Sequence, residues 1–174
     1  TMFAAILMFG EPGTQILYPD PGFPIYRSMI EFTGAEPVPV PIREENGFAF
    51  SADETLSLIT PQTRLLILNS PANPTGGVTP RAEIEKLVKG LDDHPHVAIL
   101  SDEIYDVMTY DGETHTSLLQ YPAIRDRLIV LSHIKKFGTK SFEMEHVMHL
   151  NDADAFQRLE RFRHDQLLRR LTMI

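Results

Sequence analysis

Residues 64–100 read RLLILNSPANPTGGVTPRAEIEKLVKGLDDHPHVAIL, and this stretch decides the fold class. It opens with an apolar run at 65–68 and closes with another at 97–100. Between them, residues 81–91 place apolar side chains at helical spacing, at Ile84, Leu87, Val88 and Leu91. Continuous apolar strands joined by an amphipathic helix are typical of parallel strands that are covered on both faces.

The same alternation of strands and helices continues on both sides of this stretch. We expect further strands at 15–18, 35–40 and 128–131, and further helices at 2–9, 23–33 and 51–58. The sequence therefore predicts an α/β fold of three layers, with a mostly parallel sheet and helices on both of its faces. The strands 64–69, 97–100 and 128–131 should be buried neighbours. In such sheets, ligands bind at the carboxyl ends of the strands.

The composition of the chain excludes several classes of partner. Its 174 residues carry 16 Lys and Arg against 24 Asp and Glu, a net charge of −8, so neither a nucleic acid nor an anionic membrane surface is expected. No apolar run approaches the roughly 20 residues of a membrane span, and the apolar first residues lack the basic leader of a signal peptide. No Cys is present, and the seven His lack zinc-ligand spacing, so no metal site is predicted. A cytoplasmic location is the default expectation.

A break in composition separates the end of the chain from the rest. All 13 prolines and nine of the ten glycines lie before position 123. From about residue 153 the apolar positions have the spacing of a single helix. We therefore predict one domain over residues 1–142 and an atypical helical tail over residues 143–174.

Polar segments follow three of the expected strands directly. They read SPANPTGG at 70–77, SDEIY at 101–105 and SHIKK at 132–136. A fourth loop, PDPGFPIY at 19–26, is stiffened by three prolines, which fix Phe23 at the start of a helix. Each segment alone is typical of an ordinary turn or cap. Their occurrence together, at the ends of strands, indicates a ligand site at one edge of the sheet.

The strings at 18–26, 70–77 and 101–105 resemble those of the class I and II aminotransferases, fold-type I enzymes that depend on pyridoxal phosphate (PLP). The resemblance covers about residues 1–131. It is specific because the chain carries both SPANPTGG and SDEIY, with 29 residues from Asn73 to Asp102. It implies that residues 1–142 are part of a large, PLP-binding domain.

The resemblance assigns four residues to cofactor binding, and the chemistry of the cofactor explains their types. Asp102 would pair with the protonated pyridine nitrogen, which makes the ring an electron sink. Asn73 and Tyr105 would donate hydrogen bonds to the phenolate oxygen of the ring. Phe23 matches the position whose aromatic side chain stacks on the pyridine.

The family also requires a lysine that bonds to the cofactor and then moves a proton. Aligning the chain without a gap from residue 131 puts Lys136 in that position. Lys135 and Lys140 are the alternatives, in that order. The family pattern Gly-Trp-Arg, whose arginine holds the phosphate, is missing here, because the chain has no Trp and no Arg between positions 127 and 158.

The resemblance implies transfer of an amino group between an amino acid and a 2-oxo acid, and a homodimer for the intact family. Two alternatives stay open. One is a lyase of the same fold or an enzyme similar to aminocyclopropane-carboxylate synthase. The other is a truncated, catalytically silent chain that binds a ligand or dimerises. The missing phosphate-binding pattern predicts low activity for these 174 residues alone.

Overall fold

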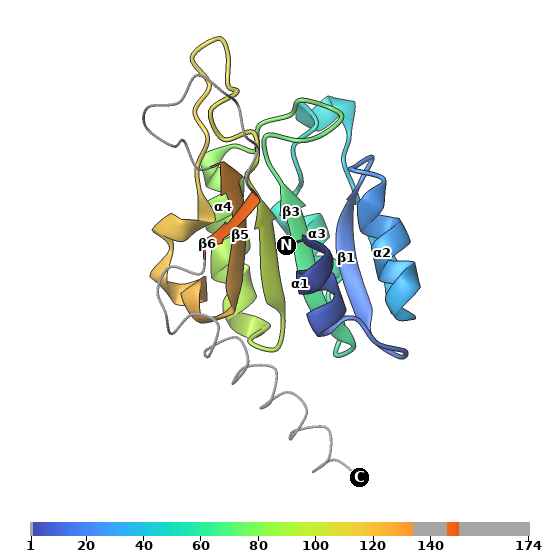
Figure 1. The fold of residues 1–174 in the computed structure, drawn as a ribbon. Helices are drawn as coiled ribbons and strands as arrows, with labels where there is room; N and C mark the ends of the chain where they lie inside the picture. The colour runs from blue at the N-terminus through green and yellow to red at the C-terminus, as the bar shows by residue number, and fades with distance from the viewer. Residues whose placement is uncertain (1, 134–145, 150–174) are drawn as a thin grey trace.

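The computed structural model describes residues 2–133 and 146–149, which form one six-stranded sheet (Figure 1). The strands lie in the order β2-β1-β3-β4-β5-β6. Their bounds are Gln15–Asp20 (β1), Glu36–Pro41 (β2), Thr63–Asn69 (β3), Ala98–Asp102 (β4), Leu128–His133 (β5) and His146–His149 (β6). Neighbours among β1 to β5 are parallel, and β6 runs antiparallel to β5. The predicted α/β fold is confirmed, and so is the side-by-side arrangement of β3, β4 and β5.

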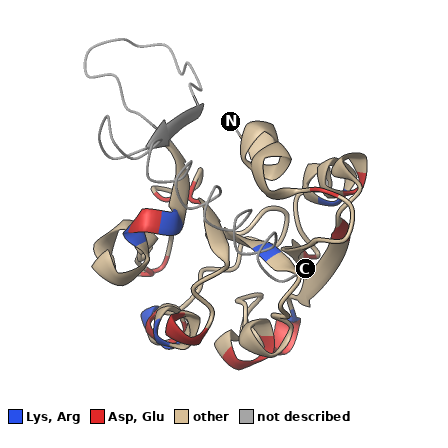
Figure 2. Cartoon of the chain, turned by 90° about the horizontal axis from the view of Figure 1, so that it is seen from below, with Lys and Arg blue, Asp and Glu red and all other residues tan. Residues whose placement is uncertain are grey.

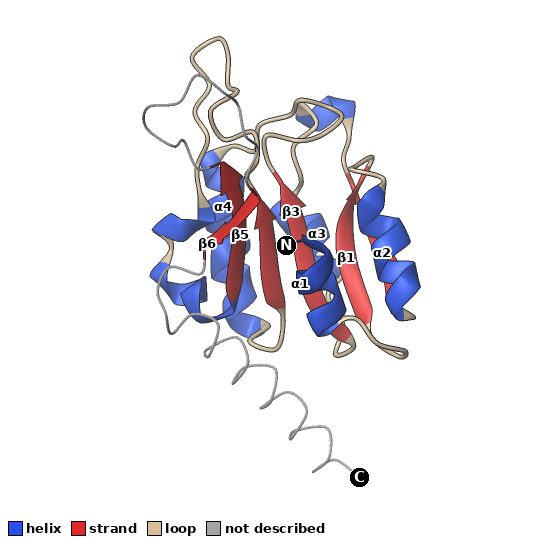
Figure 3. Cartoon of the chain, viewed as in Figure 1, coloured by secondary structure: helices blue, strands red, loops and turns tan. Residues whose placement is uncertain are grey.

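Helices cover both faces of this sheet, as the sequence predicts (Figure 3). Helices α1 (Met2–Phe9) and α2 (Ile25–Thr33) pack on one face, and α3 (Ala52–Ser57) and α4 (Arg81–Gly90) pack on the other. The connections also contain short 3-10 helices that the sequence did not predict: η1 (Glu44–Asn46), η2 (Leu91–Asp93), η3 (Leu118–Gln120) and η4 (Pro122–Arg127).

The central strands bury both of their faces, which explains their continuous apolar sequence. On β3, Leu65 and Ile67 belong to the core beneath α1 and α2, whereas Leu66 and Leu68 belong to the core beneath α3 and α4. Side chains alternate between the faces of a strand. Asp102, two residues after Leu100, therefore lies on the face that α1 and α2 cover.

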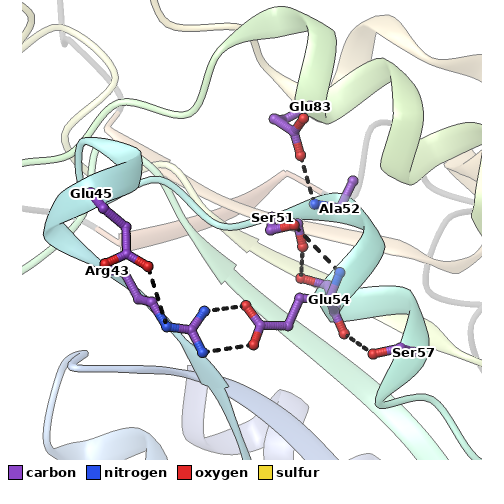
Figure 4. Close-up of polar contacts among 8 residues, drawn as sticks. Arg43, Glu45, Ser51, Ala52, Glu54, Ser57 and Glu83 are labelled. Carbon is purple, nitrogen blue, oxygen red and sulfur yellow. Dashed lines mark hydrogen bonds and ion pairs between the residues drawn. The ribbon is translucent and has the colours of Figure 1, made fainter.

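The start of α3 is held by side chains from three parts of the chain (Figure 4). The Ser51 hydroxyl accepts a hydrogen bond from the Glu54 N–H, the usual arrangement of an N-cap. Glu83 of α4 accepts a hydrogen bond of 2.7 Å from the Ala52 N–H. Arg43 donates to Glu54 from its two terminal guanidinium nitrogens, Nη1 and Nη2, at 2.5 and 2.8 Å. These contacts join α3 to α4 and to the connection after β2.

Helix α1 differs from the other helices in charge. Figure 2 shows that it carries no Lys, Arg, Asp or Glu, whereas α2 and α4 carry both signs and α3 carries acidic residues. Its buried residues are Ala5, Ile6 and Phe9, while Phe3 and Leu7 are exposed. No helix among the described residues is long and apolar enough to cross a bilayer.

Strand β6 is an element that the sequence analysis missed. It lies within the segment 143–174, expected as a helical tail, and it pairs with β5 from Val130↔His149 to His133↔His146. A four-residue strand has too few positions for a periodic pattern, so only its pairing partner reveals it. The helix expected from about residue 153 lies outside the described residues.

Candidate functional site

Asp102 is the centre of a polar network at the carboxyl end of β4. Its side chain is buried, with the residue only 8% exposed. Carboxylate oxygen Oδ2 accepts a hydrogen bond of 2.5 Å from the Tyr26 hydroxyl, and Oδ1 accepts one of 3.4 Å from the Ile104 N–H. These two donors are neutral, so they support the carboxylate without cancelling its charge.

Tyr26 comes from α2, 76 residues earlier in the chain, and is fully buried. Burial raises the pKa of its hydroxyl far above the ordinary value, and the charge of Asp102 and the hydrogen bond to it raise this pKa further. Tyr26 therefore keeps its proton throughout the physiological range and acts as a donor to Asp102. The sequence analysis did not single out Tyr26. Its place three residues after Phe23, on the buried side of an amphipathic helix, is the signal that was available.

Asn69 joins the ends of β3 and β4 and was also missed as a site residue. In the register of the sheet it lies opposite Asp102. Its Nδ2 donates to the Asp102 carbonyl at 3.0 Å, and its Oδ1 accepts from the Asn73 N–H at 2.7 Å. The buried Asn69 amide therefore links two of the predicted cofactor residues.

Phe23 and Tyr105 both lie near Tyr26. The Phe23 ring meets the Tyr26 ring edge-on, with ring centroids 5.7 Å apart and an angle of 82° between the planes. Tyr105, in the turn after β4, lies close enough to Tyr26 to raise the pKa of its hydroxyl. Both side chains are partly exposed. Tyr26 and Asn69 thus connect Phe23, Asn73 and Asp102 through direct contacts, and Tyr105 lies near Tyr26.

A second buried cluster lies immediately after Asp102. Glu103 accepts hydrogen bonds from the Ser101 hydroxyl at 2.8 Å and from the Leu118 N–H at 3.0 Å. Its Oε2 lies 3.0 Å from His115 Nε2, which must carry the proton because a carboxylate only accepts. Burial raises the pKa of Glu103, but hydrogen bonds from His115, Ser117 and the Leu118 N–H outweigh it and hold the pKa below its usual range.

The Glu103 cluster closes a loop. It joins the start of the connection between β4 and η3 to its end, and this connection carries Tyr105. The cluster therefore anchors both ends of the segment that presents one of the predicted site residues.

The three candidate lysines, Lys135, Lys136 and Lys140, lie outside the described residues. Their assignment stays a prediction, as do the cofactor roles of the four residues above. Among residues 2–133 and 146–149, no group of three or more His, Cys, Asp or Glu is placed to hold a metal ion.

Comparison with known proteins gives the same family from sequence and from structure. Residues 2–141 match the family model for aminotransferase class I and II. An arginine–pyruvate transaminase of Pseudomonas aeruginosa is 38% identical over 135 residues, which are 78% of this chain and 34% of that protein. An aromatic-amino-acid aminotransferase of Thermococcus litoralis is 36% identical over 128 residues, 74% of this chain and 33% of that protein.

Solved structures agree with the sequence relatives. The aspartate aminotransferase of Rhizobium meliloti superposes with a TM-score of 0.72 at 30% identity, over 76% of this chain and 33% of that one. A Pyrococcus protein designated A1 has a TM-score of 0.75 at 30% identity, over 96% of this chain and 43% of that one. The chain spans about a third of the length of the curated relatives that it matches. Because the family model matches residues 2–141, the chain belongs to the class I and II aminotransferase family.

Proposed function

We propose that this chain forms the ring-binding part of a PLP-dependent amino-acid aminotransferase, whose substrates are an amino acid and a 2-oxo acid. Class I aminotransferases use PLP. The observation that carries the proposal is the buried Asp102 carboxylate, held by the Tyr26 hydroxyl at the carboxyl end of β4 and linked through Asn69 to Asn73.

The residues at this edge have the chemistry that the ring of PLP requires. A protonated pyridine nitrogen needs an anionic acceptor, and Asp102 is a buried carboxylate. The phenolate oxygen needs donors, which the Asn73 amide and the Tyr105 hydroxyl supply. A flat ring needs an aromatic partner, and Phe23 offers a partly exposed ring that packs edge-on against the Tyr26 ring. The donor set therefore fits the group.

When bound, PLP supplies an electron sink for bond breaking at the α-carbon of the substrate. In the proposal, Asp102 holds the proton on the ring nitrogen. Asn73 and Tyr105 orient the ring by its phenolate oxygen, and Phe23 covers one face and keeps water from it. Lys136, or else Lys135 or Lys140, takes and returns the proton at the substrate α-carbon.

One feature of the sequence limits what these 174 residues do alone. They contain no Gly-Trp-Arg pattern for the phosphate, which carries a charge of about −1.5 to −2. We therefore propose weak PLP binding and little turnover for the isolated chain. The same departure favours a second candidate, a chain that binds its ligand without catalysis. A homodimer and a cytoplasmic location complete the proposal.

The proposal is tested by mapping where PLP reacts. The chain is mixed with PLP below one equivalent, its absorption spectrum is recorded, borohydride is added, and the modified lysine is found by peptide mass analysis. Lys86 and Lys89 of the charged helix α4 are internal controls, because surface lysines also react with aldehydes. We expect modification at Lys136, Lys135 or Lys140, and less of it in Asp102→Asn. Modification mainly at Lys86 and Lys89, unchanged in Asp102→Asn, would contradict ring binding at this site.

A further inference from the structure

We propose that Tyr26 is a positioning residue that keeps the Asp102 carboxylate ionised and oriented toward a protonated pyridine ring. This inference rests on the proposed function and adds to it a residue of α2 that acts through Asp102. It starts from the hydrogen bond of 2.5 Å between the Tyr26 hydroxyl and Asp102 Oδ2, two buried groups from distant parts of the chain.

The direction of this hydrogen bond decides its effect. A carboxylate accepts a hydrogen bond from a hydroxyl, and a donor to the ionised form stabilises the charge. Burial acts in the opposite sense, because a buried carboxylate loses its hydration. Tyr26 therefore compensates for part of the burial of Asp102. Since burial also raises the pKa of Tyr26 itself, the hydroxyl stays protonated and the donor is always present.

The packing around Tyr26 fixes where this donor lies. The Tyr26 ring is fully buried in the core beneath α1 and α2, and the Phe23 ring lies against it edge-on. One tyrosine therefore supports both the predicted stacking residue and the predicted charge partner of the ring. The Asn69 amide binds the Asp102 carbonyl and the Ile104 N–H binds Oδ1, so Tyr26 adds the contact to the other carboxylate oxygen, Oδ2.

Loss of the hydroxyl would shift the balance of charge across the pair formed by Asp102 and the ring nitrogen. Without the donor, the ionised carboxylate becomes less favourable, and the proton moves from the ring nitrogen toward Asp102. Tyr26→Phe removes only the hydroxyl and retains the ring that contacts Phe23. The matched control is Tyr121→Phe, because the Tyr121 hydroxyl is buried without a hydrogen-bond partner among the described residues, and its ring packs on the opposite face of the sheet.

The experiment uses PLP labelled with ¹⁵N in its ring, bound to the 174-residue chain, and reads the chemical shift of that nitrogen. We expect the shift of a protonated ring in the unaltered chain and in Tyr121→Phe. In Tyr26→Phe the resonance should move toward the value of a neutral pyridine. An unchanged resonance in a folded Tyr26→Phe variant, with folding checked by circular dichroism, would overturn the inference.

Two further measurements separate the possible failures. A PLP analogue with a carbon in place of the ring nitrogen should bind less tightly than PLP to the unaltered chain. If the two bind equally, the proposed function fails and the positioning role fails with it. If Tyr26→Phe does not fold, 3-fluorotyrosine placed at position 26 alone makes the hydroxyl a stronger donor. It should then move the ring resonance further toward the protonated value, and a shift in the other direction would refute the role.

Discussion

Glu103→Gln tests whether the charge of a buried carboxylate stabilises this fold. Glu103 is 3% exposed and accepts hydrogen bonds from His115, Ser101 and the Leu118 N–H. A hydrogen bond to a charged group contributes about 1.5–3 kcal/mol and a neutral one about 0.5–1.5 kcal/mol, so three such bonds lose on the order of 3 kcal/mol. Gln loses less hydration on burial than ionised Glu, which offsets part of that loss. We expect a net destabilisation of about 1–3 kcal/mol at pH 7.

The dependence of this difference on pH distinguishes charge from shape. The hydrogen bonds hold the pKa of Glu103 below the ordinary value of 4.5, which is taken for the unfolded chain. The stability that comes from the charge is therefore fully present above pH 4.5 and is lost as the pH falls through the pKa of the folded state. Protonated Glu and Gln are both neutral, so the difference between the two proteins should shrink in acid.

Urea unfolding followed by far-ultraviolet circular dichroism measures this difference, at pH 7 and at steps down to the acid limit of folding. Glu85→Gln is the matched control, because the Glu85 side chain is 51% exposed and pairs with Arg81 on the surface of α4. The control should lose less than about 0.5 kcal/mol. A Glu103→Gln difference that is near zero at pH 7, or that stays constant from pH 7 into acid, would refute the reasoning.

Three other perturbations test the N-cap of α3, the hydrogen bonds of Asn69 and the role of Asp102. Ser51→Ala removes the N-cap of α3 and should destabilise the protein by about 1 kcal/mol in urea unfolding, whereas Ser57→Ala, at the exposed other end of that helix, should have a smaller effect. Asn69→Leu leaves the Asn73 N–H without this partner and should cost about 1–3 kcal/mol, whereas the Asp102 carbonyl still accepts from the Ser70 N–H. Asn69→Asp retains the acceptor for Asn73 and should weaken PLP binding less than Asn69→Leu does; equal binding losses would contradict a bridging role. Asp102→Asn should leave the fold intact by circular dichroism and lower any transamination by orders of magnitude, and unchanged turnover would exclude the assigned role.

The sequence by itself determined the fold class and the edge of the sheet where the site is expected. The apolar runs at 65–68 and 97–100 have no alternation, so both of their faces must be buried, and a helix with the spacing of 81–91 supplies one of the covers. Local turn chemistry then identified the segments that follow the strands. Both features depend on residues that are close along the chain, so they can be recognised in the sequence alone.

Tertiary structure decided which side chains meet. Tyr26 and Asp102 are 76 residues apart, and Glu103 joins His115 only because the chain turns back after β4. Neither pairing has a periodic or local signal, since a buried hydrogen bond depends on the packing of whole elements. Strand β6 likewise exists through its pairing with β5. The sequence therefore indicated the residue types of the site, while packing alone selected Tyr26 and Asn69 as the groups that hold Asp102 in place.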